Sequence, residues 1–392
     1  MFTIKRLLGS VAAIAMAVAL GGPASAQTQG VTKDEIVIGS LQDLSGPIAL
    51  FGKQARNGMQ MSTDDQNAKG TIHGRKLKLI VEDHGYDPRK AQLAGQKLLQ
   101  QDKVFAIIGH IGTATNMAIL PAMKEKNVLN LFPLTGARQM FEPVDKLKFA
   151  VAMPYYDQLV VALPKLIKEK GYKNVGILYQ DDDFGQEVLQ GAEDALKKVN
   201  MKLVEKTSFK RGATDFSTQV AKLKAANVDL IVLGTIIRET VGTIAETKKL
   251  GWKVDYLGVS ALYTQMIPRL GRQAMDGLMG TNQVDVPYVD SASKEVAAWV
   301  AAYKAKFNED PDVFAVYGYS FVNLFIAAAQ KAGPNLTVDT MVAALESSEF
   351  PSDMFGSPVY KFSKTNHLGN DKTKIAVIKN GKWVNMTDYI GH

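Results

Sequence analysis

Short apolar runs alternate with amphipathic segments along most of this chain. We expect strands where apolar runs are short, and helices where apolar residues recur every three or four positions. The predicted strands lie at 36–41, 77–82, 105–108, 128–131, 175–179, 202–209 and 230–233. The predicted helices lie near 53–68, 90–101, 115–126, 156–170, 185–199, 215–226 and 239–250. This alternation is typical of βαβ crossovers, in which helices cover both faces of a parallel sheet.

The pattern starts afresh near Ala150. The segment FAVAMPYYDQ interrupts the alternation of strands and helices. A second strand–helix series follows, and it ends at the segment TNQVDVPYVD. Long helices are expected near 292–306 and 315–331, and the tail is expected to be antiparallel, with a hairpin turn at Asn380-Gly381. We therefore predict two α/β lobes, with a ligand cleft between them at the carboxyl ends of their strands.

The first residues, MFTIKRLLGSVAAIAMAVALGGPASAQ, predict a cleavable export signal over 1–26. Lys5 and Arg6 precede an apolar stretch, and Ala24-Ser25-Ala26 offers the small residues that a signal peptidase needs. A membrane anchor is the less favoured alternative, because the apolar stretch is short of the roughly 20 residues that span a bilayer. We expect no other segment to be apolar and long enough to cross a membrane, so we expect a periplasmic protein.

Composition narrows the class of protein. The chain has 392 residues, enough for two domains, a formal charge of +7 and no cysteine. The lack of cysteine excludes disulfides, a lipid-modified N-terminal cysteine and thiolate metal sites. Lysines and arginines are scattered among nearly as many acids, without a basic block interleaved with aromatics. Nucleic-acid binding is therefore not expected.

No motif of a familiar enzyme chemistry occurs. The GxGxxG and GxSxG patterns are absent, and SGPIALFGKQ departs from a phosphate-binding loop in its glycine spacing and in Gln54. The 5 histidines lack metal-ligand spacing. The run Asp181-Asp182-Asp183 suits a helix cap better than a cation site. We predict no catalytic residue, metal or cofactor, and keep an unfamiliar enzyme as the least favoured alternative.

The stretch FAIIGHIGTATN at 105–116 has the pattern of a strand, a turn and a helix. Gly112 allows close approach of the backbone, and Thr113 stands where the free N–H groups of the helix begin. Free N–H groups and a hydroxyl suit a carboxylate without a formal cation. On these residues alone, a plain helix cap at Thr113 is the favoured interpretation.

Several longer motifs, taken together, carry a resemblance to a known family. They are IVIGSLQDLSGPIALFGKQARNGMQM at 36–61, EDHGYDPRKA at 82–91, FAIIGHIGTATN, VLNLFPLTGA at 128–137, GILYQDDDFGQE at 176–187 and DFSTQVAKLKAANVDLIVLG at 215–234. From about residue 33 to the tail, the chain resembles the type I periplasmic solute-binding proteins of ABC transporters, in the Leu/Ile/Val-binding branch.

The resemblance implies an α/β fold of two Rossmann-like lobes joined by a three-segment hinge. Lobe one would hold 27–151 and 285–360, and lobe two would hold 152–284 and 361–392. Such lobes close on a small solute and present it to an ABC transporter permease in the inner membrane. The implied solute is a small apolar carboxylate, either a branched-chain or aromatic amino acid or an aromatic or aliphatic carboxylic acid. A monomer is expected, and a ligand sensor of the same fold is the alternative.

The resemblance also implies a ligand site. Its residues are Gly112, Thr113 and Leu134-Thr135-Gly136 around the carboxylate, together with Phe51, Phe184, Ile236, Ser260 and Phe314. Core packing is the alternative for each phenylalanine. Relatives often carry threonine in place of Gly136, and Leu/Ile/Val binders tend to carry glutamate in place of Ser260. Because a buried ammonium without a carboxylate partner is costly, we hypothesise an acid without an α-amino group.

Four charged side chains have two interpretations each. Asp181 or Glu239 could replace the carboxylate that Ser260 lacks. Arg138 and Arg238 could bind the ligand carboxylate, although a solvent-facing role is favoured for both.

Three tyrosines also stay open. Tyr317 and Tyr319 could line the pocket or pack within a helix, and packing is favoured. Some relatives have a disulfide that joins the positions of Tyr86 and Gly112, where a large residue opposite the smallest could substitute for the bond by packing.

Overall fold

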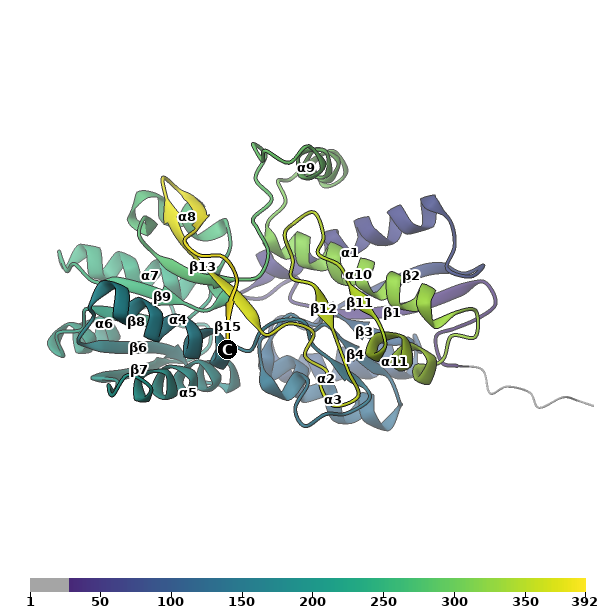
Figure 1. Ribbon diagram of the computed structural model, residues 1–392, viewed down its shortest axis with the longest axis horizontal. Helices are drawn as coiled ribbons and strands as arrows, with labels where there is room; N and C mark the ends of the chain where they lie inside the picture. The colour runs from purple at the N-terminus through teal and green to yellow at the C-terminus, as the bar shows by residue number, and fades with distance from the viewer. Residues whose placement is uncertain (1–27) are drawn as a thin grey trace, which may run out of the picture.

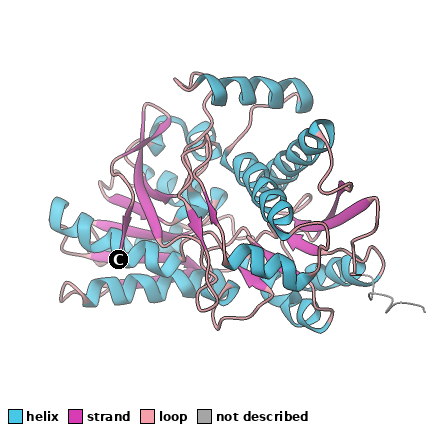
Figure 2. Cartoon of the chain, turned by 45° about the vertical axis from the view of Figure 1, so that its right-hand side comes forward, coloured by secondary structure: helices cyan, strands magenta, loops and turns pink. Residues whose placement is uncertain are grey.

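The computed structural model describes residues 28–392, and the predicted signal peptide lies outside the described residues. Figure 1 shows two lobes side by side, with most of the teal segments in the second lobe. Each lobe contains its own sheet, and helices flank the strands of both (Figure 2). The predicted architecture of two α/β lobes is therefore confirmed.

The main sheet of the first lobe is parallel throughout. Its strand order is β2-β1-β3-β4-β5, so β1 lies between two strands that follow it in the chain. Parallel pairing places the carboxyl ends of these strands at one edge, which is where ligands bind in open α/β sheets. The strands are β1 (Glu35–Gln42), β2 (Lys76–Asp83), β3 (Ala106–Ile108), β4 (Leu129–Leu131) and β5 (Lys148–Phe149).

The second sheet combines five parallel strands with antiparallel ones from the tail. Its order is β14-β13-β10-β9-β8-β6-β7, and β15 pairs with β13. The predicted hairpin is present, because Asn380 (φ 51°) and Gly381 (φ 73°) connect β13 to β14. The strands are β6 (Val175–Gln180), β7 (Glu205–Phe209), β8 (Leu230–Gly234), β9 (Asp255–Gly258), β10 (Met279–Asn282), β13 (Lys372–Lys379), β14 (Lys382–Asn385) and β15 (Ile390–Gly391). A separate small pair is formed by β11 (Glu349–Phe350) and β12 (Tyr360–Lys361).

The helices agree with the predicted pattern and extend it. In the first lobe, α1 lies along α10 (Figure 1). The helices of this lobe are α1 (Ala49–Lys69), α2 (Pro88–Gln100), α3 (Thr113–Glu125), α9 (Lys294–Phe307), α10 (Val313–Ala332) and α11 (Val338–Glu346). Those of the second lobe are α4 (Tyr155–Lys170), α5 (Asp183–Lys197), α6 (Ser217–Ala225), α7 (Ile237–Lys249) and α8 (Met266–Gly271). As predicted, Asp182 caps α5 by accepting hydrogen bonds from the Phe184 and Gly185 N–H groups.

Among the strands of the main sheets, β5, β9 and β10 were not predicted, and neither was the two-residue β15 of the tail. They are short, and β10 has the sequence MGTN, which lacks an apolar run. Their neighbours in the sheet supply the partners that make them strands: β4 pairs with β5, and β10 lies between β9 and β13. The strand predicted over 202–209 is shorter than expected, because pairing with β6 begins at Glu205.

Helix α10 meets the length and hydropathy criteria for a membrane span, and among the described residues it is the one helix that does. The expectation that no segment beyond the signal would do so is therefore wrong. However, 72% of its most apolar stretch is buried inside the protein. Phe321 and Phe325 of α10 lie in the core of the first lobe, so this burial identifies α10 as a core helix.

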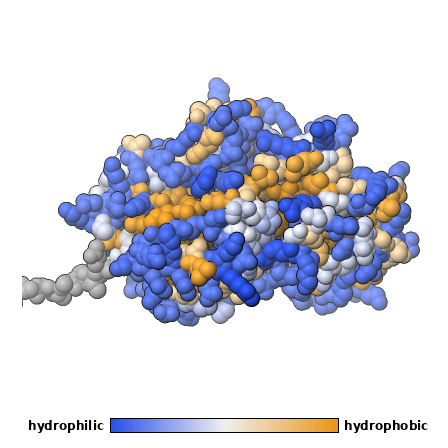
Figure 3. All heavy atoms as spheres, turned by 180° about the vertical axis from the view of Figure 1, so that it is seen from behind, coloured by the Kyte–Doolittle hydropathy of each residue, from blue (hydrophilic) through white to orange (hydrophobic). Residues whose placement is uncertain are grey.

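The chain passes between the lobes after β5, after β10 and after β12. The lobe boundaries at 151, 284 and 360 remain predictions. The largest apolar cluster includes Phe51 and Tyr86 of the first lobe together with Tyr155 and Phe184 of the second. The lobes therefore contact each other across the cleft. From behind, polar residues cover most of the surface, and apolar residues gather in a band across its middle (Figure 3).

Candidate functional site

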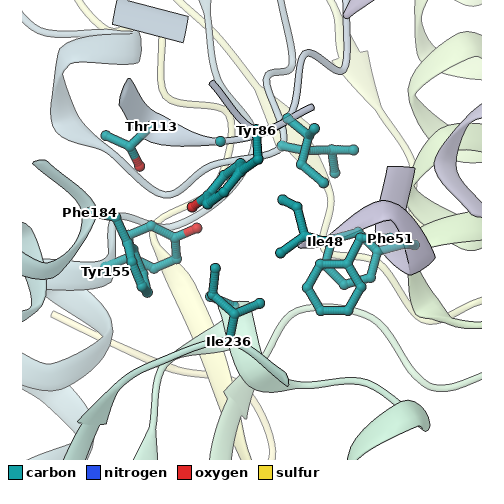
Figure 4. A pocket seen from close by; sticks show the side chains of 12 residues that line it. Ile48, Phe51, Tyr86, Thr113, Tyr155, Phe184 and Ile236 are labelled. Atoms are coloured by element: carbon teal, nitrogen blue, oxygen red, sulfur yellow. The ribbon is translucent and has the colours of Figure 1, made fainter. Parts of the chain in front are cut away.

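A hollow of about 350 Å³ lies between the lobes, and we call it the first chamber. Figure 4 shows side chains converging on it from both lobes, with Ile48 and Phe51 across from Phe184. The lining residues are Ile48, Phe51, Tyr86, Ile111, Gly112, Thr113, Leu134, Tyr155, Phe184, Ile236, Ala261 and Phe314.

A second hollow of about 460 Å³ adjoins the first, and we call it the second chamber. The two share Leu134, Tyr155, Ala261 and Phe314 as lining residues, so they are parts of one cleft. The other residues that line the second chamber are Pro133, Thr135, Gly136, Val151, Ala152, Ser260, Gln283, Tyr317, Phe321 and Tyr360.

Two threonine hydroxyls meet where the chambers join. Thr113 Oγ1 lies 2.7 Å from Thr135 Oγ1, and both side chains are buried. Thr113 is the first residue of α3, whose first turn contains no acidic residue. The opening N–H groups of this helix have no partner further back in the helix, and its dipole favours an anion. Hydroxyls and helix donors together suit a carboxylate group.

The turn before α3 depends on glycine. Gly112 has a backbone φ of 93°, a value that residues with a side chain rarely adopt. A Cβ atom at Gly112 would also lie 2.8 Å from the Tyr86 ring. Asn116 Nδ2 donates hydrogen bonds to the His110 and Gly112 carbonyls, which holds the turn against the first turn of the helix. The backbone of Gly112 and the ring of Tyr86 are therefore in close contact, as expected for this pair.

Two phenols bring further hydroxyls to the first chamber. Figure 4 shows the oxygens of Tyr86 and Tyr155 pointing toward each other. Burial and the nearby Asp182 carboxylate raise the pKa of Tyr86, and burial raises the pKa of Tyr155. Both phenols therefore remain protonated at neutral pH and can donate hydrogen bonds.

Aromatic rings form the rest of the wall. Phe51 stacks on Phe314 with ring centres 3.8 Å apart and planes 12° from parallel. Tyr155 and Phe184 meet edge to face at 5.0 Å. Rings packed in this way present a rigid apolar surface to a flat or branched hydrocarbon group.

The cleft contains no charged side chain. Within residues 28–392, no Asp, Glu, Lys or Arg lines either chamber. The same residues contain no group of three or more His, Asp or Glu side chains placed to hold a metal ion. The polar groups that face a ligand are therefore hydroxyls, the Gln283 amide and backbone N–H groups.

Comparison with known proteins identifies the family. The family model described as periplasmic binding protein matches residues 35–382. The chain belongs to the periplasmic binding protein family. The Leu/Ile/Val-binding protein of Escherichia coli is 25% identical over 278 residues, which cover 71% of this chain and 74% of that protein. The resemblance inferred from the motifs is thus confirmed.

Solved structures of similar proteins share the fold. A fatty acid ABC transporter substrate-binding protein from Thermomonospora curvata has a TM-score of 0.83 at 22% identity, covering 93% of this chain and 95% of that chain. A solute-binding protein of an ABC transporter from R. palustris, solved in complex with benzoate, has a TM-score of 0.78 at 20% identity and covers 91% and 98%. These matches confirm the predicted fold class.

All ten predicted ligand residues line the cleft of this periplasmic binding protein. Phe51, Gly112, Thr113, Phe184 and Ile236 line the first chamber, Thr135, Gly136 and Ser260 line the second, and Leu134 and Phe314 line both. Their contact with a ligand remains a prediction.

Ser260 is held by hydrogen bonds to Gln158. The Ser260 N–H donates to Gln158 Oε1 at 2.9 Å, and Gln158 Nε2 donates to Ser260 Oγ at 3.0 Å. Thr281 Oγ1 also donates to Gln158 Oε1. A neutral network therefore stands at the position where Leu/Ile/Val binders tend to carry glutamate.

The two arginines considered for the ligand carboxylate do not line either chamber. Arg138 Nη2 lies 2.6 Å from Asp157 Oδ1, and its guanidinium carbon lies 4.4 Å from the centre of the Tyr156 ring. Arg238 is exposed at the start of α7. Arg138 therefore joins the lobes, and the solvent-facing interpretation holds for Arg238.

The two acids considered as ammonium partners do not line the cleft either. Asp181 pairs with Lys210 at 2.7 Å. Glu239 accepts a hydrogen bond from the Ile236 N–H and so caps α7. Neither carboxylate replaces the one that Ser260 lacks.

The remaining tyrosines divide. Tyr317 lines the second chamber, whereas the Tyr319 hydroxyl donates to Asp65 Oδ2 at 3.1 Å and lines neither chamber. Tyr317 therefore fits both interpretations, because it lines the second chamber and also packs on Phe314 and Phe321 of its own helix.

Sequence reasoning missed Tyr155 and Gln283 as lining residues. Tyr155 begins α4, and its ring lies over Gly136, where an added Cβ would come within 2.9 Å of Tyr155 Cδ1. Tyr155 thus fills the space that a threonine side chain at 136 would need. The only sequence signal was the aromatic pair in FAVAMPYYDQ, directly before the second strand–helix series.

Proposed function

We propose that this protein captures a small apolar carboxylic acid without an α-ammonium group and delivers it to the permease of an ABC importer. The observation that carries this proposal is the uncharged cleft, in which hydroxyls and helix N–H groups meet beside aromatic walls. The protein acts by binding, and no catalytic step is proposed.

The carboxylate grip uses neutral donors. Hydrogen bonds to an ionised group contribute about 1.5–3 kcal/mol each, more than bonds between neutral groups. In a cleft shielded from water these bonds strengthen further, because the local dielectric constant is low. Thr113, Thr135 and the first turn of α3 therefore offer donors for a carboxylate without an arginine or lysine.

Among the described residues, no carboxylate lines the cleft to pair with an α-ammonium group. Moving an ammonium ion from water into a poorly solvated site costs several kcal/mol unless an opposite charge compensates. Ser260 offers only one hydroxyl oxygen, which already accepts a hydrogen bond from Gln158. The cleft therefore favours the acid over the corresponding amino acid.

Relatives show that the fold admits both kinds of ligand. The Escherichia coli relative is a Leu/Ile/Val-binding protein, and the R. palustris structure contains benzoate. Since the fold alone does not select between them, the residues at the cleft decide. The absence of an acidic lining residue within 28–392 supports the benzoate-like alternative for this chain.

Lobe closure supplies the capture step. Arg211 of the second lobe donates to the Tyr86 carbonyl of the first lobe at 2.7 Å and pairs with Asp182 at 2.5 Å. Arg138 makes a second contact in the opposite direction, from the first lobe to Asp157. Such contacts stabilise the closed form, and a ligand that touches both lobes shifts the population toward it. The permease would recognise this closed form in the periplasm.

A thermal-shift screen tests the proposal. Purified protein is heated with benzoate, phenylacetate and 4-methylpentanoate, each beside an amino acid of matched side chain: phenylglycine, phenylalanine and leucine. At 100 times Kd, a ligand stabilises the folded state by about 2.7 kcal/mol. We expect stabilisation by at least one acid and none by its amino counterpart. Stabilisation by leucine or phenylalanine, but by none of the acids, would refute the proposal.

A further inference from the structure

The second chamber contains a buried amide without a protein partner. Gln283 lines this chamber and is 4% exposed, and its Nε2 atom makes no hydrogen bond within the part of the chain that the structure describes. Its backbone is fixed, because the Tyr389 hydroxyl donates to the Gln283 carbonyl at 2.6 Å. An unpaired buried donor is destabilising, so such a group calls for an explanation.

The place of Gln283 follows from the second sheet. β9 and β10 are parallel neighbours, with Gly258 opposite Gly280. Gln283 follows the carboxyl end of β10, and Ser260 lies two residues beyond the end of β9. Both side chains therefore reach the cleft from adjacent strand ends of lobe two, beside the carboxylate grip that lobe one provides.

A second polar group lies at the same chamber. The Tyr317 hydroxyl has no hydrogen-bond partner among the described residues, and its ring packs edge to face on Phe314 at 5.8 Å. The first chamber, by contrast, is lined chiefly by apolar and aromatic side chains. The cleft thus offers an apolar compartment, a carboxylate grip and a neutral polar compartment.

We propose that the second chamber binds an uncharged oxygen substituent of the ligand, a hydroxyl or keto oxygen, through the Gln283 amide and the Tyr317 hydroxyl. This inference rests on the proposed function and specifies its substrate class, an oxygenated apolar carboxylic acid. An amide both donates and accepts, so a ligand hydroxyl matches it in both roles. A charged substituent does not fit, because no lining residue of the second chamber carries an opposite charge.

Calorimetric titration of matched ligand pairs tests this inference. The parent acids are phenylacetate and 4-methylpentanoate, and each is compared with its α-hydroxy, α-keto and, for the aromatic acid, para-hydroxy derivative. In the wild-type protein, at least one derivative is expected to bind about tenfold more tightly than its parent, equivalent to about 1.4 kcal/mol. The Gln283→Met variant, which keeps the side-chain length but removes the amide, is expected to lose this advantage, so that it binds the derivative no more tightly than the parent.

Two further variants make the outcome specific. Tyr317→Phe keeps the ring and should reduce the same preference. Gln219→Met removes an amide outside both chambers, where Gln219 Nε2 donates to the Ser208 carbonyl, and should leave every affinity unchanged. Circular dichroism and melting temperature establish that each variant is folded.

The possible results separate this inference from the proposal on which it rests. If the parent acids bind but no derivative binds more tightly, the oxygen subsite is refuted and the carboxylate proposal stands. If Gln283→Met weakens parent and derivative equally, the amide has only a structural role and the inference fails. If neither parents nor derivatives bind, the carboxylate proposal itself fails, and the inference falls with it.

Discussion

Replacing Thr113 by valine tests the carboxylate grip directly. Valine has nearly the shape of threonine and lacks only the hydroxyl. In the folded protein this hydroxyl lies 2.7 Å from Thr135 Oγ1 and lines the first chamber. The change therefore removes one donor to the ligand and the partner of Thr135, with little change in packed volume.

The expected loss follows from the charge of the ligand. A hydrogen bond to an ionised group contributes about 1.5–3 kcal/mol. At 1.4 kcal/mol for each factor of ten, this corresponds to an increase in Kd of about ten- to 150-fold. Binding should not vanish, because the first-turn N–H groups of α3 and Thr135 remain.

Calorimetric titration with an acid that stabilises the wild-type protein measures this loss. Thr243→Val is the matched control, because Thr243 is fully buried in α7 and its hydroxyl has no partner among the described residues. The control should bind the acid as wild type does and melt at the same or a higher temperature. The N-cap of α3 is Gly112, and no side chain of the described residues caps this helix, so the cap interpretation of Thr113 is wrong. If Thr113→Val binds within about threefold of wild type, the Thr113 hydroxyl does not hold the carboxylate. If the control loses as much affinity as Thr113→Val, the loss reports packing and not recognition.

Three further predictions concern charge. Burial raises the pKa of the Glu187 carboxyl from 4.5 to about 7. Between these two pH values the folded state holds a proton that the unfolded chain releases. The stabilisation that this proton gives at low pH is therefore lost as pH rises through about 7. Melting temperatures from pH 5 to 8 should therefore fall less in Glu187→Gln than in wild type, and parallel curves would contradict this. Ser260→Glu places a carboxylate in the second chamber. Calorimetry should then show weaker binding of the acid and binding of leucine. An unchanged affinity for the acid would contradict this prediction. Arg211→Met removes the hydrogen bond that crosses the cleft to the Tyr86 carbonyl, together with the pair to Asp182 within lobe two. Stopped-flow traces should therefore show faster ligand release with little change in association, and an unchanged release rate would contradict a role in closure.

The order of strands and helices could be predicted because each main strand has its own local signal. The apolar run VGILYQ of β6 is buried almost throughout. A strand that helices cover on both faces has such a continuous apolar sequence, because nearly every side chain is buried. The strand β10 (MGTN) has no such signal and exists because β9 and β13 pair with it. Pairing between segments far apart in the chain is invisible to local pattern.

The candidate site divides in the same way. Thr113 and Thr135 were predicted from the family resemblance, and in the structure each follows a buried strand of the first sheet, at the edge that the carboxyl ends of parallel strands share. Gln283 could not be predicted, because it follows the strand that the pattern missed. Tyr155 could not either, because its ring reaches the cleft from lobe two and lies over a glycine of lobe one. Contacts between lobes depend on how the lobes close, which no segment encodes by itself.

Charge and ligand recognition occupy different places in this protein. The cleft is lined by neutral groups, whereas Arg138 and Arg211 join the lobes outside the chambers, where their side chains are 33% and 24% exposed. Partly exposed ion pairs keep some hydration and avoid the full cost of burying charge. Burying neutral donors in the cleft costs less desolvation free energy than burying charged ones. Their hydrogen bonds to a ligand become stronger when closure excludes water. The proposed function therefore predicts that closure and recognition can be altered separately. Changes at the arginines should act on how long the lobes stay closed, and changes at the hydroxyls should act on which acid is bound.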